Sequence, residues 1–335
     1  MPAAAHRLNG SQIVARTLRA EMERDPSIIV MGEDVAQLGG VFGATRGLLG
    51  RFGADRVLDT PISETAFVGA AIGAAQSGLR PVVEIMFVDF IGVCFDQLIN
   101  EMAKHRYMSG GEQTTGLVVR TAGGCIGAAG QHSQILSATL AHAPGLKVVL
   151  PATLRDLQGL LVAALRDPDP VVIIEHKRLL KATAETLAFG APVEDLDAPE
   201  PIEIGRLQRV RDGADLTIVA SGFMSQLAWE AAVELERSTG RSVGVVDLRT
   251  ISPLDRAGLL REAPAAPRML VVDEDYGAFG VCAEVMAVLA EGLGRDAPLM
   301  GRLAPSSPVP ASARLESAVV PSAVSIAERA ALLLA

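Results

Sequence analysis

The sequence predicts an α/β fold made of two doubly wound domains. Short runs of β-branched residues alternate with longer helical patterns along the 335 residues, which is typical of βαβ units and a parallel sheet. The chain is too long for one ordinary core. Hydrophobic residues make up 49% of it, so each of two domains can bury a core without disulfides.

The first domain is expected to contain six strands with helices between them. The strands are predicted at residues 27–31, 56–59, 81–87, 116–120, 146–150 and 170–176, and the helices at 11–24, 64–77, 92–108, 133–142 and 153–166. Residues 177–203 then lose this periodicity and contain several prolines and acids, which is typical of a linker or an irregular surface segment.

A second alternating set of strands and helices follows. Its strands are predicted at residues 215–222, 242–250 and 268–275, and its helices at 224–238, 254–262, 280–292 and 322–334. We therefore expect a first domain at 1–190, a linker at 191–205 and a second domain at 206–335.

Composition excludes several classes of protein. The three cysteines include no CxxC pair, which argues against a zinc site and a secreted disulfide scaffold and favours a reducing cytoplasm. The net charge of −9, without a basic cluster, disfavours nucleic acid as a partner. Residues 84–95 form the most apolar run, but Asp89 interrupts it and it is too short to span a membrane. We expect no signal peptide and a cytoplasmic protein.

Candidate site residues follow the predicted strands, because ligands of open parallel sheets bind beyond the carboxyl ends of the strands. Glu64 begins a helix rich in Ala and Gly, "ETAFVGAAIGAAQSG". An acid in a first helical turn also complements the helix dipole, with Ser63 as N-cap. The small side chains, however, would let a partner subunit approach. Partial desolvation there would raise the pKa of Glu64 toward the range useful for proton transfer.

His132 follows the glycine-rich stretch 123–130 at a predicted helix start, where the backbone is exposed. A hydrogen-bonded structural histidine is the alternative interpretation. The glycine-rich stretch lacks GxGxxG spacing, and the chain contains no GxxxxGK[ST], so a phosphate-binding role is disfavoured.

Several motifs in a fixed order then resemble one family. They are "GEDVAQLGGVFGATRGL", "RVLDTPISE", "EIMFVDF", "FDQLINEMAKHRYMSGG", "GQHSQ", "PGLKVVLPAT" and "DLRTISPLD". From about residue 8 to the C-terminus, the chain resembles the β subunit of the thiamine-diphosphate-dependent component of 2-oxo acid dehydrogenase complexes. The family includes pyruvate, branched-chain 2-oxo acid and acetoin dehydrogenases. The resemblance implies a pyrimidine-binding domain followed by a transketolase-type C-terminal domain.

The resemblance also implies roles for five residues. Glu64 would contact a pyrimidine nitrogen of thiamine diphosphate, Phe90 would stack on the pyrimidine ring, and Ile62 would pack nearby. His132 would lie near the reacting carbon and assist transfer of the acyl group. Glu33 would line a polar passage between paired active sites, although it is also an ordinary strand-end acid.

Metal ions and partners are implied in the same way. Potassium would be bound largely through backbone carbonyl groups, at positions matching Leu117, Ala164, Leu165, Asp167 and Asp169. Relatives bind the diphosphate through Mg²⁺ and a Gly-Asp-Gly motif, which is missing from this chain. Because the part of the site that binds the diphosphate is missing, the resemblance implies an α subunit that carries it, in an α₂β₂ heterotetramer. The second domain would serve assembly and docking of the lipoyl acyltransferase, and the acids of "VVDED" (271–275) are read as solvated strand-end residues.

Three functions follow as hypotheses. The first is a catalytic β subunit that decarboxylates a 2-oxo acid or cleaves acetoin and then acylates lipoamide, with acetoin and pyruvate ranked ahead of branched-chain substrates. The second is a non-catalytic assembly or docking subunit. The third is a split transketolase-type carboligase.

Overall fold

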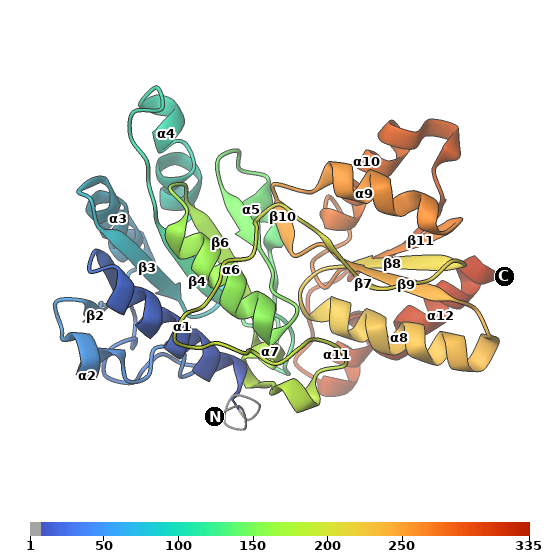
Figure 1. Cartoon of the computed structure of the whole chain (residues 1–335), viewed down its shortest axis with the longest axis horizontal. Coiled ribbons are helices and arrows are strands. Elements are labelled where there is room, and N and C mark those ends of the chain that lie inside the picture. The colour runs from blue at the N-terminus through green and yellow to red at the C-terminus, as the bar shows by residue number, and fades with distance from the viewer. Residues whose placement is uncertain (1–7) are drawn as a thin grey trace.

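The computed structural model describes residues 8–335 and has two sheets side by side (Figure 1). Within this range the first sheet has seven strands in the order β10-β5-β6-β4-β3-β1-β2, and the second has five in the order β12-β11-β8-β9-β7. The strands are β1 (Ile28–Gly32), β2 (Val57–Asp59), β3 (Arg80–Ile85), β4 (Val118–Gly123), β5 (Lys147–Val149), β6 (Val171–His176), β7 (Gln208–Arg211), β8 (Leu216–Ala220), β9 (Val243–Asp247), β10 (Thr250–Ser252), β11 (Arg268–Val272) and β12 (Leu299–Leu303). All pairs are parallel except those of β10 and β7. The predicted α/β fold with two doubly wound domains is confirmed.

Helices cover both faces of each sheet. The α-helices are α1 (Gly10–Arg24), α2 (Leu48–Phe52), α3 (Glu64–Gln76), α4 (His105–Met108), α5 (Ser137–Ala141), α6 (Leu154–Arg166), α7 (Lys177–Lys181), α8 (Phe223–Thr239), α9 (Arg256–Glu262), α10 (Val281–Leu293), α11 (Ala313–Val319) and α12 (Ala323–Leu334). Shorter 3₁₀ or π segments are η2 (Val88–Gly92), η3 (Gln97–Met102), η4 (Ala184–Thr186), η5 (Ala263–Ala265) and η6 (Gly294–Asp296).

Successive residues of the central strands face two different cores. Val82 of β3 packs in a core with α1 and α6, whereas Val83 packs in the core that contains α3. This second core is continuous with residues of β8, β9 and β11, so it extends across both sheets. Burial on both faces explains why the strands read as apolar runs rather than as alternating patterns.

The predicted strand at 242–250 is divided between the two sheets. After β9, Arg249 has a φ of 56°, which turns the backbone away from the second sheet. Residues Thr250–Ser252 then pair antiparallel with β5 and complete the first sheet. The predicted division of the chain into domains at residues 190 and 205 stays a prediction. Residues 1–7 of the predicted first domain lie outside the described part of the chain.

Two predicted helices differ from those in the structure. Residues 92–108 form the end of η2, a π-helix and the short α4 instead of one continuous helix. The helix predicted at 133–142 spans only Ser137–Ala141, because Leu136 has a φ of 52° and the residues before it form a loop. Positive φ values are unfavourable for a residue with a side chain, and the sequence carried no signal for one here.

The most apolar helical stretch lies at the C-terminus. Residues 313–334 are long and apolar enough to cross a membrane by composition, but Pro321 separates α11 from α12. The inner face of α12 packs on α8, β11 and β12, with Ile326 and Ala330 fully buried. This packing is that of a surface helix with one buried face in a globular domain.

A buried charge cluster joins three adjacent strands of the first sheet. The Arg120 guanidinium on β4 donates to Glu175 on β6 at 2.7 and 2.8 Å, and to Glu84 on β3 at 2.7 Å. All three side chains are at most 6% exposed. The cluster links the three strands, and removal of one member would leave buried charge without compensation.

Replacing Arg120 with methionine is expected to lower the free energy of unfolding by about 3–5 kcal/mol, because two buried carboxylates would lose their cation. Thermal and urea unfolding of the purified chain would measure the loss. Arg241→Met, at an exposed arginine that contacts Asp215, is the control. Equal stability of the two variants would contradict the role of the cluster.

Candidate functional site

The four main predicted site residues lie after neighbouring strands of the first sheet. Glu33 follows β1, Glu64 opens α3 after β2, Phe90 belongs to η2 after β3, and His132 lies in the loop after β4. Since these strands are adjacent in the order β4-β3-β1-β2 and parallel, their carboxyl ends meet at one edge. The sheet order therefore brings together residues that are about a hundred positions apart.

Glu33 and Glu64 form a pair of buried carboxylates. Glu33 is 9% exposed and Glu64 is 7% exposed. Burial raises the pKa of Glu33, and the negative charges of Glu64 and Asp34 raise it further. Ser63 occupies the N-cap position of α3, but its side chain makes no capping hydrogen bond. Such a pair can take up a proton or bind a protonated nitrogen.

Phe90 and His132 belong to an aromatic cluster centred on Phe87. Ring centroids of Phe87 and His132 are 4.9 Å apart, those of Phe90 and His132 are 5.5 Å apart, and both pairs are edge-to-face. Phe87 also contacts Phe90 and Phe42, each at 5.7 Å. The imidazole of His132 is therefore placed by packing against rings from other elements.

The start of α3 is tied to the segment that carries Phe90. The Thr65 hydroxyl donates to the carbonyl oxygen of Val93 at 2.7 Å. Burial, and then the charge of Glu64, raise the pKa of the buried Cys94 thiol to about 12. Ile62 is 85% exposed and lies just before the helix, so its side chain is available to a ligand or a partner rather than packed within the chain.

Lys177 is a site residue that sequence reasoning missed, because it begins the segment 177–203, which was interpreted as a linker or an irregular surface segment. Its side chain is fully buried. The ammonium group donates to the carbonyl oxygens of Gly124, at 3.0 Å, and His132, and lies 5.1 Å from the centroid of the Phe87 ring. Burial lowers the pKa of Lys177. The sequence offers only a lysine directly after a strand as a signal.

The acids that follow β11 are buried, so their description as solvated strand-end residues is wrong. Asp273, Glu274 and Asp275 are 3–8% exposed. Glu274 accepts hydrogen bonds from the backbone N–H of Cys125 at 2.7 Å and from Nε2 of His176 at 2.8 Å. The second domain thus contacts the loop that carries His132.

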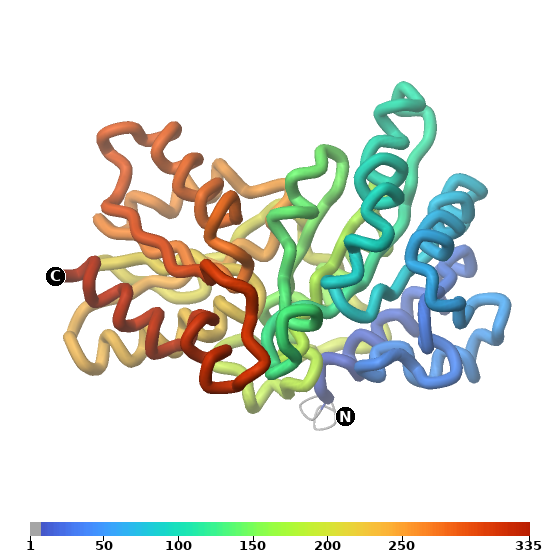
Figure 2. The backbone as a smooth tube through the Cα atoms, turned by 180° about the vertical axis from the view of Figure 1, so that it is seen from behind, coloured from blue at the N-terminus to red at the C-terminus, as the bar shows by residue number. Residues whose placement is uncertain are grey.

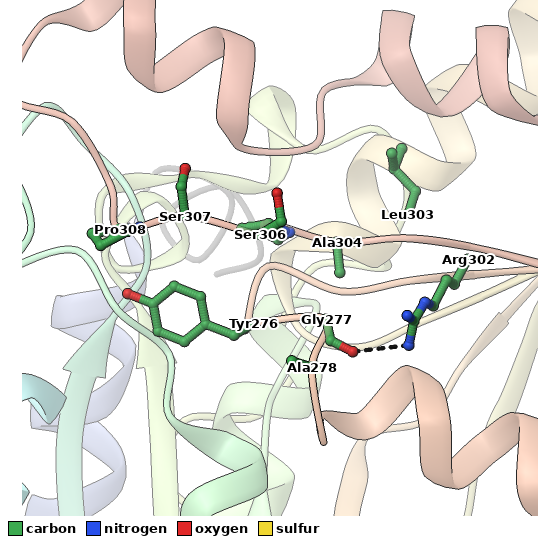
Figure 3. A pocket seen from close by; sticks show the side chains of 10 residues that line it. Tyr276, Gly277, Ala278, Arg302, Leu303, Ala304, Ser306, Ser307 and Pro308 are labelled. Atoms are coloured by element: carbon green, nitrogen blue, oxygen red, sulfur yellow. Dashed lines mark hydrogen bonds between the residues drawn. The ribbon is translucent and has the colours of Figure 1, made fainter.

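Tyr276 extends this contact between the domains. Its hydroxyl donates to Oε1 of Gln134 at 3.3 Å. With Arg302 and residues 306–308 it lines a cavity of about 520 Å³, in which the Arg302 guanidinium bonds to the carbonyl oxygen of Gly277 (Figure 3). Every residue that lines this cavity belongs to the second domain.

The predicted potassium positions lie near one another, but cationic side chains already contact them. Nη1 of Arg80 donates to the carbonyl oxygens of Leu165, at 2.9 Å, and Asp167, at 3.0 Å. The Asp167 carboxylate bonds to Lys147 at 2.7 Å. Asp169 bonds to Arg106 at 2.5 Å and to Lys147 at 3.2 Å.

The remaining two positions also have backbone partners. The carbonyl oxygen of Leu117 accepts from the N–H of Val171 at 3.1 Å, and that of Ala164 from the N–H of Asp167 at 3.2 Å. As arranged, these residues do not offer potassium a free cage of carbonyl oxygens. Binding would require Nη1 of Arg80 to withdraw, so the potassium site stays a prediction.

Replacing Arg80 with leucine is expected to lower the free energy of unfolding by about 1.5–3 kcal/mol, because two carbonyl groups lose a charged donor. Thermal unfolding in KCl and in choline chloride of equal ionic strength would measure the loss. Recovery in KCl alone would indicate that the ion takes the place of Nη1. An unchanged melting temperature in both salts would contradict the structural role of Arg80.

Glu33→Gln is expected to raise the melting temperature by about one to three degrees at neutral pH. Folding favours protonated Glu33 because its pKa is raised. The stability that protonated Glu33 contributes is therefore lost as the pH rises from the ordinary glutamate pKa through the raised value. Glutamine stays neutral, so the variant does not lose this stability. Melting curves from pH 4 to 8 without thiamine diphosphate would measure the effect, with the exposed Glu112→Gln as control. A lower melting temperature at neutral pH would contradict it.

Comparisons with known proteins agree with this arrangement. Residues 7–183 match the pyrimidine-binding domain of transketolase, and residues 205–326 match the transketolase C-terminal domain. A solved structure described as a split-gene transketolase, an inactive β4 tetramer, superimposes with a TM-score of 0.77. It is 21% identical and covers 97% of this chain and 98% of its own. That likeness shows the fold.

Curated relatives show the family. The chain is 42% identical to the β subunit of acetoin:2,6-dichlorophenolindophenol oxidoreductase from Cupriavidus necator, over 97% of both chains. It is 41% identical to the β subunit of 2-oxoisovalerate dehydrogenase from Bacillus subtilis, over 87% of both. It is 38% identical to the β subunit of the pyruvate dehydrogenase E1 component of the same organism, over 95% of this chain and 96% of the relative. The chain belongs to this family of transketolase-like dehydrogenase and oxidoreductase β subunits.

Proposed function

We propose that this chain is the β subunit of an α₂β₂ dehydrogenase that depends on thiamine diphosphate. With its α subunit it decarboxylates a 2-oxo acid or cleaves acetoin, and it passes the acyl group to the lipoyl group of an acyltransferase component. One observation carries the proposal: buried Glu64 and the packed pair of Phe90 and His132 lie beyond adjacent strands of a pyrimidine-binding domain.

Glu64 and Phe90 fit the pyrimidine half of a cofactor site. Glu64 is buried at a helix start, where it can accept or share the proton of a ring nitrogen. Phe90 offers an apolar ring just after β3, and the exposed side chain of Ile62 lies just before α3. Thiamine diphosphate, when bound, supplies the carbon nucleophile of the reaction. Glu33, beside Glu64, favours retention of a proton in this region.

His132 is proposed to act on the substrate side of the site. Its ring packs edge-to-face against Phe87 and Phe90, so the edge that is not packed can exchange a proton with a reacting oxygen. The same position suits transfer of the acyl group to a lipoyl arm that enters from outside. Its backbone carbonyl bonds to Lys177, which limits movement of the residue.

An α subunit is proposed because the diphosphate half of the site is missing from this sequence. The chain contains no Gly-Asp-Gly motif for Mg²⁺. The outer face of α3 supports a close partner, because Ala66 and Ala70 are exposed there. Gly73 is also exposed and has open space where a Cβ would be, so packing within the chain does not require glycine at this position. The α subunit would carry the magnesium.

The alternative functions have less support. The likeness to the split transketolase is at 21% identity, whereas the curated relatives at 38–42% identity are dehydrogenase and oxidoreductase subunits. A non-catalytic docking subunit would not need buried Glu64 and packed His132. Since the relatives of acetoin, pyruvate and branched-chain type are nearly equally similar, the substrate has to be decided by assay. Three buried free cysteines agree with a cytoplasmic location.

Replacing Glu64 with glutamine is expected to lower turnover at least about a hundredfold, because the carboxylate can no longer hold the proton of the ring nitrogen. The chain would be co-expressed with the subunit that carries the Gly-Asp-Gly motif. Reduction of 2,6-dichlorophenolindophenol would be followed with pyruvate, branched-chain 2-oxo acids and acetoin.

Glu234→Gln, at an exposed glutamate on α8, is the matched control and should keep wild-type turnover. Full activity of Glu64→Gln would contradict the proposed role. An assembled tetramer that binds the cofactor but turns over none of the substrates would favour the carboligase. One that binds no cofactor would favour the docking subunit.

A further inference from the structure

The loop that carries His132 is bonded from both domains. Residues 124–136 connect β4 to α5 and contain few regular hydrogen bonds of their own. From the second domain, Glu316 on α11 accepts from the backbone N–H of Gly127 at 2.9 and 3.1 Å. Viewed from behind, the red C-terminal segment lies against this green loop (Figure 2). The loop therefore depends on other parts of the chain for its conformation.

One peptide unit of this loop is bonded at both of its polar atoms by buried charged side chains. The carbonyl oxygen of Gly124 accepts from Nζ of Lys177 at 3.0 Å, and the adjoining N–H of Cys125 donates to Oε1 of Glu274 at 2.7 Å. Hydrogen bonds to charged groups are about twice as strong as neutral ones. Rotation of the Gly124–Cys125 peptide would break both of them.

Glu274 is itself fixed by His176. The backbone N–H of Arg178 donates to Nδ1 of His176 at 3.1 Å, so the ring proton is on Nε2 and is donated to Glu274 at 2.8 Å. Burial opposes ionisation of Glu274, but the interactions with His176 and Cys125 outweigh it and lower its pKa. Glu274 is therefore an ionised acceptor with both oxygens engaged.

Gly124 packs directly against the His176 ring. A Cβ on Gly124 would lie 2.0 Å from Nε2 of His176, and the φ of Gly124 is +91°. The His176 ring is also stacked on Phe223 of the second domain, with centroids 4.8 Å apart. His176 therefore packs between Gly124, at the start of the loop, and Phe223 of the second domain.

We infer that Lys177 and Glu274 are positioning residues for His132. Lys177 binds the Gly124 carbonyl and the His132 carbonyl, which ties the start of the loop to His132, and Glu274 binds the N–H of the Gly124–Cys125 peptide from the second domain. The second domain therefore sets the position of a residue in the first domain's site. This inference rests on the proposed function, since it assigns His132 a part in the reaction.

The test is a double-mutant cycle in the assembled tetramer. Lys177→Met and Glu274→Gln would each be made in the wild type and in His132→Gln. Each alone is expected to lower turnover about ten- to hundredfold, because small displacements of a reacting group are costly. In His132→Gln the same changes should lower the residual turnover less than about twofold. Lys181→Met, at an exposed lysine of the same helix, and Glu234→Gln are the controls.

An equal fold-loss in both backgrounds, or no loss in the wild type, would overturn the inference. Glu274→Gln keeps the size of the side chain, so the cycle can be completed with it if Lys177→Met does not assemble. Amide hydrogen exchange of residues 124–133 is a second measurement that needs no activity. Exchange should accelerate in both variants and not in the controls. Unchanged exchange would overturn the inference that Lys177 and Glu274 hold the loop. Absence of turnover in the wild type would count against the proposed function alone.

Discussion

The carboxyl ends of four adjacent parallel strands meet at one edge of the first sheet, and the proposed site depends on this constraint. The order β4-β3-β1-β2 brings Glu33, Glu64, Phe90 and His132 to the same edge although they come from distant parts of the sequence. The buried guanidinium of Arg120 links β3, β4 and β6 of the same sheet. The side chains at this edge are therefore attached to a rigid sheet, and proton transfer and ring stacking require such fixed positions.

The second domain contributes directly to the structure of the first domain. Its β10 completes the first sheet, and one apolar core extends across both sheets. Buried Glu274 bonds to the loop after β4 in the first domain. Through this contact the second domain supports the loop that carries His132.

Local patterns predicted the two-domain α/β fold, the strand-end positions of the proposed site residues and most strands, but they missed β7 and β12 and merged β9 with β10. They could not predict contacts that form only in three dimensions. Lys177 was assigned to a linker or an irregular surface segment because periodicity is lost there, and its partners, the Gly124 and His132 carbonyl oxygens, have no sequence signal. The acids at 273–275 looked solvated because the surface that covers them belongs to the other domain. The helix before Ser137 was predicted too long because positive φ values in the loop depend on tertiary packing.

Binding of thiamine diphosphate tests the central claim, that this chain supplies one half of a shared site, most directly. Calorimetric titration in the presence of Mg²⁺ would compare the chain alone, the assembled tetramer and a tetramer containing Glu64→Gln. The account predicts no measurable binding by the chain alone and saturable binding by the tetramer, weakened by Glu64→Gln. Equal binding by the chain alone and by the tetramer, or binding unaffected by Glu64→Gln, would contradict it.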